Sequence, residues 1–404
     1  MQLLGKKRAM EAELLASRYF KGTQDAKYPT GWYWASFGED LRKGQVKPVE
    51  FMGRHFALFR AKNGTVGLMD AQCCHMGADL GHGGKVVGDR LVCGYHGWEF
   101  NTDGKCEHMP LVEERHMTSR ACQPTLPVVE RAGNIWFWYG SSTPTKEFPD
   151  VSYFNNRKEF LTFKGEVHLG HSDPLPIMEH VSDVYHFQHN HGTTEPMEYV
   201  ITRDEGDTFE YKLRPQVGSA QRSKVQAFFK PYAFVELAGP CSGIYRTQLS
   251  DETNRRTPML TVITGVTPVR EGYTLWTWRV IVRRPIRLGP IGYLFDYLFG
   301  RIIWALIRKN VHIDVEAINW LNPNKGIERE LFNGVRLPER VWVKPDGMSV
   351  REYQKFYYRN IEGSKSDVSI SRHAPVKEGQ GIDDESEIRA DFEVEDRPLV
   401  GQLD

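Results

Sequence analysis

The sequence predicts an α+β protein with an N-terminal all-β domain and a C-terminal domain in which helices cover an antiparallel sheet. Three observations lead to this expectation. Short alternating apolar runs flank Asn63 and Gly64, a strong β-hairpin signal. A stretch that contains Ser, Thr and Pro, residues 141–150, indicates a linker. Beyond the linker, strand-like runs alternate with helical patterns, one of which runs from Tyr293 to Asn319.

The elements follow in chain order. Two further strands of the first domain are expected at Val128 and Asn134. In the second domain we expect a helix at 175–189, strands at 225–237, 259–266 and 274–282, and then the long helix. The tail is acidic and poor in aromatic residues, so we expect it to wrap another surface or stay mobile. The expected segments are an amphipathic helical lead-in (1–30), the first domain (31–145), the second domain (146–362) and an acidic extension (363–404).

Composition narrows the class of protein. The chain has 404 residues with 52 basic and 52 acidic side chains. It therefore lacks the excess of basic residues that is typical of a nucleic-acid-binding protein. No uninterrupted apolar segment opens the chain, so we expect no secretory signal and a cytoplasmic location. Asp296 and Arg301 interrupt the most apolar stretch, residues 291–307, and we therefore expect no transmembrane span. An ordinary buried amphipathic helix is the preferred interpretation there, with a substrate entrance or a membrane contact as the alternatives.

A cysteine and histidine motif is the strongest chemical signal. Six cysteines are too few for a disulfide scaffold in a chain this long. One residue separates Cys73 from His75, seventeen residues separate His75 from Cys93, and two residues separate Cys93 from His96. Each short loop therefore offers one thiolate and one imidazole. This arrangement suits a 2Fe–2S cluster in which thiolates hold one iron and imidazoles the other. The alternative, a structural zinc site, usually keeps its cysteine pair and its histidine pair in separate loops.

The residues around this motif support a cluster. Glycines such as Gly77 and Gly97 let the backbone close around sulfur and offer N–H donors to it. Trp98 is expected to shield the site from water. Cys74 lies beside the predicted ligand, and we interpret it as a packed, non-ligating thiol.

A second motif runs from Glu179 to His191. Glu179, Asp183 and His186 are spaced four and then three residues apart, which places them on one face of a continuous helix. His191 follows His186 by five residues and cannot share that face. Gly192 is a helix stop, so His191 is expected to turn back toward the same metal.

Two histidines need one carboxylate to form the facial triad of a non-haem iron(II) site. Asp314 falls within about 20° of Ile303 on the apolar face of the long helix, whereas Glu316 falls on the far side. A buried carboxylate is costly unless it is paired or metal-bound, so Asp314 is the predicted ligand. His180 and His189 are expected to project elsewhere. A non-ligand role is the alternative for each of these histidines and for Asp314.

Both motifs carry a resemblance to a known family. Residues 72–80 and 93–100 resemble the Rieske box of ring-hydroxylating and related oxygenases. Residues 179–191 resemble the family's catalytic signature, an acid-x3-Asp-x2-His-x4-His pattern, and the resemblance covers residues 30 to about 360. It implies a Rieske 2Fe–2S cluster and a mononuclear Fe(II) in one terminal oxygenase. It also implies that Asp183 bridges to a Rieske histidine of a neighbouring subunit, within a homotrimer. The implied ligands are Cys73, His75, Cys93 and His96 for the cluster, and His186, His191 and Asp314 for the mononuclear iron.

The resemblance extends to a branch of the family. Residues 314–320 and 351–358 are similar to the steroid-active branch, which includes 3-ketosteroid 9-alpha-hydroxylase and cholesterol 7-desaturase. Asn319 departs from that branch by separating Ile318 from Trp320, and residues 93–106 resemble chlorophyllide a oxygenase. The implied activity is an O₂-dependent hydroxylation or related C–H oxidation of a bulky, largely apolar polycyclic substrate such as a steroid.

Two other functions remain open. One is a natural-product tailoring oxygenase that cyclises, desaturates or demethylates its substrate. The other is a Rieske electron-transfer protein without oxygenase activity. No G-x-G-x-x-G loop follows a strand, so electrons are expected from a ferredoxin and a ferredoxin reductase.

Overall fold

The computed structural model describes residues 28–118, 120–191, 197–215, 232–248, 258–270, 272–286, 289–321 and 346–361. The chain divides into two units, Met1–Gly363 and Ser364–Asp404, and every described residue belongs to the first. The expected helical lead-in, up to residue 27, and the acidic extension lie outside the described residues.

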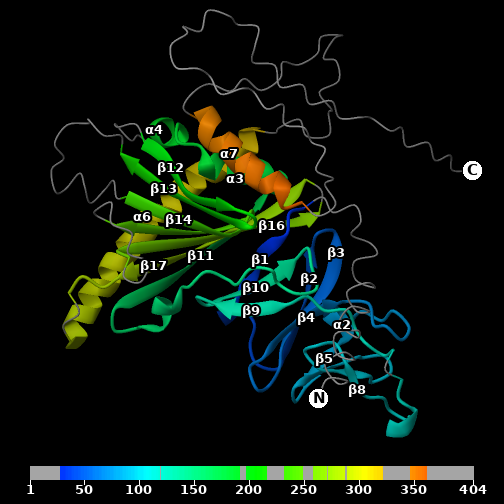
Figure 1. Cartoon of the computed structure of the whole chain (residues 1–404). Helices are drawn as coiled ribbons and strands as arrows, with labels where there is room; N and C mark the ends of the chain where they lie inside the picture. Colours follow the sequence, from blue (N-terminus) through cyan, green and yellow to red (C-terminus); the bar gives the residue numbers. More distant parts are fainter. Residues whose placement is uncertain are drawn as a thin grey trace, which may run out of the picture. The chain divides into compact units, whose positions relative to one another are not determined.

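The N-terminal part is built from three small antiparallel sheets (Figure 1). The first has the order β1-β10-β9, the second β2-β3-β4 and the third β5-β6-β7-β8. Strands β3 and β4 pair antiparallel around Asn63 and Gly64, which confirms the predicted hairpin. Gly64 has a φ of 103°, a conformation that glycine adopts without strain. The elements are β1 (Gly31–Phe37), η1 (Gly38–Asp40), β2 (Gln45–Phe51), β3 (Arg54–Arg60), β4 (Val66–Asp70), α2 (Leu80–Gly83), β5 (Lys85–Val87), β6 (Arg90–Val92), β7 (Glu99–Phe100), β8 (Cys106–His108), η2 (Glu114–His116), β9 (Val128–Arg131) and β10 (Asn134–Tyr139).

The second part is a seven-stranded antiparallel sheet with helices on it, so the predicted fold class is confirmed. Its strand order is β11-β17-β16-β15-β14-β13-β12. Helix α3 contacts α7, α6 and β16, and α6 runs along β11 (Figure 1). The elements are η3 (Ser152–Asn155), β11 (Phe160–Gly170), α3 (Pro174–Ser182), α4 (His186–His189), β12 (Met197–Glu205), β13 (Thr208–Pro215), β14 (Tyr232–Gly239), β15 (Ser242–Gln248), β16 (Leu260–Arg270), β17 (Tyr273–Arg283), α6 (Gly289–Leu321) and α7 (Asp346–Arg359).

The sheet β1-β10-β9 of the first part and the seven-stranded sheet share a core. Strand β1 is buried along its whole length because it packs on β16 as well as pairing with β10. The hydroxyl of Ser242 donates to the Trp32 carbonyl at 2.7 Å, and that of Thr267 donates to the Trp34 carbonyl at 2.8 Å. These bonds satisfy polar groups that no water reaches. The two predicted metal motifs are therefore carried by parts of the chain that are packed together.

The predicted helix at 175–189 is wrong in one respect. It is two helices, because the chain leaves helical geometry at Asp183, where ψ is 125°. Counting residues on one helix face from Glu179 to His186 is therefore not valid for this segment. The long helix and the strands at 259–266 and 274–282 are confirmed as α6, β16 and β17. Of the strand expected at 225–237, residues 225–231 lie outside the described residues.

Helix α6 is far more exposed than an ordinary amphipathic helix. The preferred interpretation of residues 291–307 as a buried amphipathic helix is therefore wrong for the first half of α6. By length and composition alone, Gly289–Asn319 would suffice to cross a membrane, with a mean hydropathy of 1.3 in its most apolar part. The Asp296 carboxylate is fully buried, however, and accepts from Arg284 at 2.9 Å. Farther along, the Trp304 indole donates to the Lys164 carbonyl at 2.9 Å. The exposed apolar residues of the helix are Ile291, Tyr293, Leu294, Phe295, Tyr297, Leu298, Ile302 and Leu306.

Candidate metal centres

Two short loops of the same shape carry the first motif. In the first loop, the Cys73 N–H donates to the Ala78 carbonyl at 2.9 Å, and the Gly77 N–H donates back to the Cys73 carbonyl at 2.8 Å. The loop that begins at Cys93 repeats both bonds, at 2.8 and 3.0 Å. Gly77 and Gly97 close the two loops with φ of 77° and 74°, where a larger residue would be strained. The backbone therefore presents the two cysteines in equivalent positions, with one histidine following in each loop, two residues after Cys73 and three residues after Cys93.

The four predicted cluster ligands lie in two pairs. The Cys73 and Cys93 side chains are buried, whereas the His75 and His96 rings are exposed and lie 4.7 Å apart between centroids. Trp98 stacks on His75 with 4.4 Å between ring centroids, which covers one face of that imidazole as expected. A pair of buried thiols beside a pair of exposed imidazoles fits a cluster with one iron inside and the other at the surface.

Cys74 is exposed, so the expectation that it is packed is wrong. A hydrogen bond from its thiol to the Cys73 sulfur lowers the pKa of Cys73 to about 6. Burial raises the pKa of Cys93. Cys74 has no equivalent in the second loop, where Gly94 occupies the matching position. The symmetry of the two loops therefore still favours Cys73 as the ligand.

Gln123 holds the first loop in place, although no motif in the sequence marks it as part of the site. Its side chain is fully buried. The side-chain amide nitrogen donates to the carbonyls of Asp70 and Gln72, both at 2.7 Å, and the side-chain oxygen accepts from the Cys74 N–H at 2.9 Å. Gln123 and Cys74 are 49 residues apart, so no local pattern could have linked them.

The second motif surrounds the junction of α3 and α4. His186 is buried, and its Nδ1 lies 2.6 Å from the Asp183 backbone carbonyl. Because a carbonyl only accepts, Nδ1 carries the proton and Nε2 keeps its lone pair for a metal. Burial lowers the pKa of His186 to about 3, so the ring is neutral near pH 7. This is the protonation state that metal binding requires.

Asp314, on α6, reaches this junction. Its Oδ1 lies 2.9 Å from Nε2 of His191 and 3.2 Å from Nε2 of His180. Burial raises the pKa of Asp314, but hydrogen bonds from the two histidines outweigh it and lower the pKa to about 2. The ligand atoms of His180, His186 and Asp314 all lie within 4.8 Å of one another. This donor set of imidazoles and one half-buried carboxylate fits a divalent iron.

Not every prediction for this motif holds. His180 was expected to project elsewhere, which is wrong, because it is buried and contacts Asp314. The break at Asp183 turns α4 relative to α3, so face counting misplaced His180. His189 and Glu316 are exposed, as expected, and Gly192 lies outside the described residues.

The Asp183 side chain has a local partner. Its Oδ1 accepts from the Tyr185 N–H at 2.8 Å, which fixes the turn between α3 and α4. We expected this carboxylate to accept from a ligand histidine. Within the chain, it is the backbone carbonyl of Asp183 that contacts His186 instead. A role for the carboxylate toward a neighbouring subunit stays a prediction.

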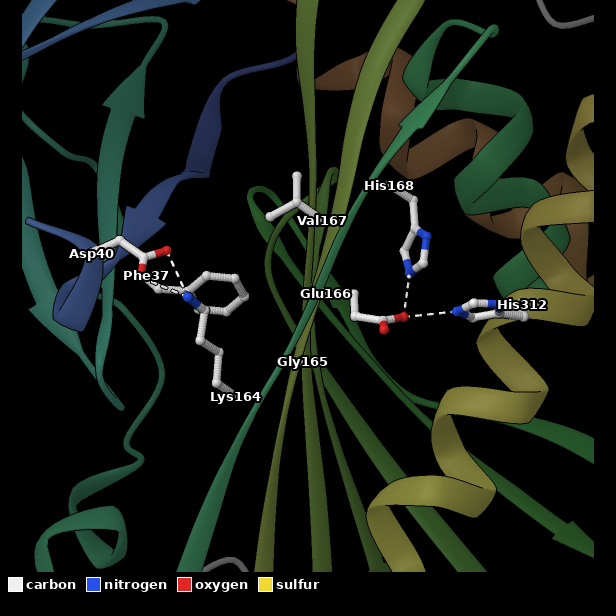
Figure 2. A pocket seen from close by; sticks show the side chains of 8 residues that line it. All are labelled: Phe37, Asp40, Lys164, Gly165, Glu166, Val167, His168 and His312. Carbon is white, nitrogen blue, oxygen red and sulfur yellow. Dashed lines mark hydrogen bonds and ion pairs between the residues drawn. The ribbon is translucent and has the colours of Figure 1, made fainter. Parts of the chain in front are cut away.

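A second group of possible metal ligands lines an open pocket of about 510 Å³ along β11, with Phe37 and Asp40 at one side and His312 of α6 at the other. Figure 2 shows Glu166 between His168 and His312. The Glu166 carboxylate is already held by His312 at 2.7 Å and by Arg308 at 2.6 Å, and the Trp278 indole donates to Nε2 of His168 at 3.3 Å. These bonds occupy the groups that a metal would need. The cluster is best explained as a clamp that ties α6 to the sheet two residues before Asp314.

Comparison with known proteins agrees with this geometry. Residues 31–128 match the Rieske [2Fe-2S] domain, so this part of the chain is a Rieske domain. Cholesterol 7-desaturase nvd 1 of Ciona intestinalis is 37% identical over 165 residues, which cover 41% of this chain and 35% of that protein. Chloroplastic chlorophyllide a oxygenase of Oryza sativa subsp. japonica is 35% identical over 120 residues, or 30% of this chain and 21% of that protein. The matches thus span about a third or less of these two relatives.

The solved structures extend the similarity to the fold. A crystal structure of dicamba monooxygenase bound to dicamba superposes with a TM-score of 0.59 at 19% identity, covering 81% of this chain and 96% of that chain. The chain therefore has the fold of a Rieske oxygenase, with the Rieske domain followed by the antiparallel sheet and its helices.

Proposed function

We propose that this chain is the terminal oxygenase of a Rieske-type non-haem iron system. It uses O₂ to hydroxylate, or otherwise oxidise at C–H, a bulky and largely apolar polycyclic substrate such as a steroid. One observation supports the proposal: the chain has a Rieske domain, and elsewhere the ring of buried His186 lies 5.2 Å from that of His191, which contacts Asp314 at 2.9 Å. An electron carrier would have no use for this second group.

The cofactors follow from the donor sets. Cys73, His75, Cys93 and His96 would hold the 2Fe–2S cluster, and His186, His191 and Asp314 would hold the iron. When bound, the cluster supplies single electrons and the mononuclear iron supplies the activation of O₂. The chain's own part is to keep His186 in the tautomer with a bare Nε2, to keep Asp314 ionised and to exclude water from their surroundings.

The steroid class is supported by the relative that is named as a cholesterol desaturase. The alternative, a tailoring oxygenase that cyclises, desaturates or demethylates a natural product, would use the same two centres on another apolar molecule. The test is a screen of sterols, 3-ketosteroids and other polycyclic compounds for compound-dependent O₂ uptake by the full chain with a ferredoxin and its reductase. Uptake with non-steroidal polycycles alone would favour the tailoring alternative.

Iron content separates an oxygenase from an electron carrier. We expect about three iron atoms per chain, two in the cluster and one at the mononuclear site. About two iron atoms per chain, with an intact Rieske spectrum, would favour an electron-transfer protein and refute the oxygenase.

We further propose that the chain works as a homotrimer in which Asp183 connects the mononuclear site to a Rieske histidine of the next subunit. Two observations support this. The cluster histidines, His75 and His96, are exposed and thus accessible to another chain. Asp183 is half-buried directly beside His186, on the turn that its Oδ1 fixes. A carboxylate between two ligand histidines would orient both rings and couple the centres.

Asp183→Asn tests this route. Asparagine keeps an oxygen that can accept from the Tyr185 N–H, so the turn should survive while the charge and the second carboxylate oxygen are lost. We expect both metal centres and the oligomer to remain, and reoxidation of the reduced cluster to slow by orders of magnitude in single-turnover spectroscopy. Wild-type rates in this variant, or an active strict monomer, would refute the intersubunit route.

The remaining parts of the proposal concern location and partners. Electrons would come from a ferredoxin and its reductase in the cytoplasm, and zero net charge gives no support for a nucleic-acid partner. A membrane span requires about 20 consecutive residues in lipid. Asp296 holds α6 to Arg284, just after β17, and Trp304 holds it to β11, so the stretches of Gly289–Leu321 before, between and after these contacts are each shorter than that. We therefore propose that the chain has no transmembrane span within α6.

A further inference from the structure

We propose that His180 is a third histidine ligand of the mononuclear metal, which makes the centre a three-histidine, one-carboxylate site. This inference rests on the proposed function, and it goes beyond the two-histidine, one-carboxylate set of the catalytic signature. It starts from the position of the His180 ring, whose Nε2 lies 3.2 Å from Oδ1 of Asp314.

The distances are those of ligands on one ion. First-row divalent metals bind nitrogen and oxygen at about 2.0–2.2 Å, so adjacent ligand atoms of one octahedral ion lie roughly 3 Å apart. Asp314 Oδ1 lies 2.9 Å from His191 Nε2 and 3.2 Å from His180 Nε2. By this measure His180 fits the site as well as His191 does. One ligand atom from each of His180, His186 and Asp314 also lies within 4.8 Å of the other two.

Burial supports the same assignment. The His180 side chain is 7% exposed, and its ring centroid lies 4.3 Å from that of His186. The ring of His191 lies 5.2 Å from that of His186 between centroids, so three imidazoles are gathered at this place. A metal ion bound among these rings would replace the protons through which His180 and His191 contact Asp314, and Nε2 of each ring could then bind the ion.

The ring is also held firmly where it stands. His180 belongs to the last turn of α3, and the preceding residue, Glu179, is buried and accepts from the Gln354 side chain of α7 at 2.6 Å. Helix α3 is therefore fixed against α7 at the position next to His180. A ligand on an anchored helix is placed more precisely than one on a loop.

A fourth protein ligand changes what the metal can accept. An octahedral ion with a facial triad keeps three positions open, whereas four protein ligands leave two. The site would then bind fewer solvent or probe molecules and would hold its metal more tightly than the triad alone.

The experiment counts histidine nitrogens on the metal in the full chain with its cluster oxidised and therefore EPR-silent. The ferrous site is treated with nitric oxide as the paramagnetic probe, and pulsed EPR compares protein with natural and ¹⁵N-labelled histidine. We expect three histidine nitrogens in the wild type and two in His180→Gln. Glutamine can still donate a hydrogen bond to Asp314, so it separates ligation from simple positioning. The exposed His189→Gln variant is the matched control and should keep three.

Metal affinity gives a second readout that does not depend on turnover. We expect His180→Gln to lose Fe(II) to a competing chelator at concentrations at least about 100-fold lower than the wild type does, since removing a direct ligand exceeds the 10–100-fold effects of outer partners. Two histidine nitrogens in the wild type would overturn the proposal and leave the oxygenase function standing. A wild-type chain with about two iron atoms and no nitrosyl signal would refute the oxygenase function itself.

Discussion

Gln123→Leu is expected to loosen the first cluster loop without removing a ligand. The wild-type amide makes three buried hydrogen bonds, two at 2.7 Å to carbonyls and one at 2.9 Å from the Cys74 N–H. Leucine fills a similar volume but makes none of them. At about 1 kcal/mol per bond the closed loop loses about 3 kcal/mol, and the unpaired groups of Asp70, Gln72 and Cys74 add to this loss. Because 1.4 kcal/mol is a factor of about ten, the open loop should become roughly 100-fold more populated.

The assay follows the decay of the Rieske visible absorption in air with a chelator present. If cluster loss passes through the open loop, the decay rate should rise by roughly 100-fold in Gln123→Leu. Gln72→Leu is the matched control, because the Gln72 side chain is exposed and only its backbone carbonyl is used in the network. Decay at the wild-type rate in Gln123→Leu would show that the network does not hold the loop and would refute this reasoning.

The other predictions concern the ligands and the clamp on α6. Cys93→Ser should bleach the visible absorption of the cluster while Cys74→Ser leaves it in place; bleaching in Cys74→Ser would show that the wrong thiol was chosen. Asp314→Ala should lose the third iron and reduce turnover by more than about 100-fold, with the Rieske spectrum intact. Glu316 is exposed, so Glu316→Ala should retain the third iron and the turnover. Iron retained in Asp314→Ala would point to another carboxylate. Burial lowers the pKa of His168 below its ordinary value of 6.5, so the folded chain binds this proton more weakly than the unfolded chain does. The free energy of unfolding should therefore fall as the pH drops through about 6.5. The urea midpoints at about pH 7.5 and about pH 5 should differ less in His168→Gln than in the wild type. A difference equal to that of the wild type would rule out His168 as the cause.

Short-range features of the chain could be predicted from the sequence because their geometry is set within a few residues. The hairpin at Asn63 and Gly64 follows from local turn conformation. Each cluster loop is closed by hydrogen bonds that span four or five residues, so a cysteine, a nearby histidine and a glycine four residues after the cysteine already indicate each loop. The long helix and the strands β16 and β17 follow from apolar periodicity in the same way.

Only the tertiary structure decided which distant residues meet. His180 and Asp314 are 134 residues apart, and their contact depends on α3 packing against α6, which neither helix specifies alone. The break at Asp183 redirects α4, so periodicity counted across it excluded His180 from the site. Gln123 reaches Cys74 from 49 residues away through a buried amide that has no sequence signature. Local spacing therefore determined which side chains could bind metal, and long-range packing determined which of them share a centre and what holds them there.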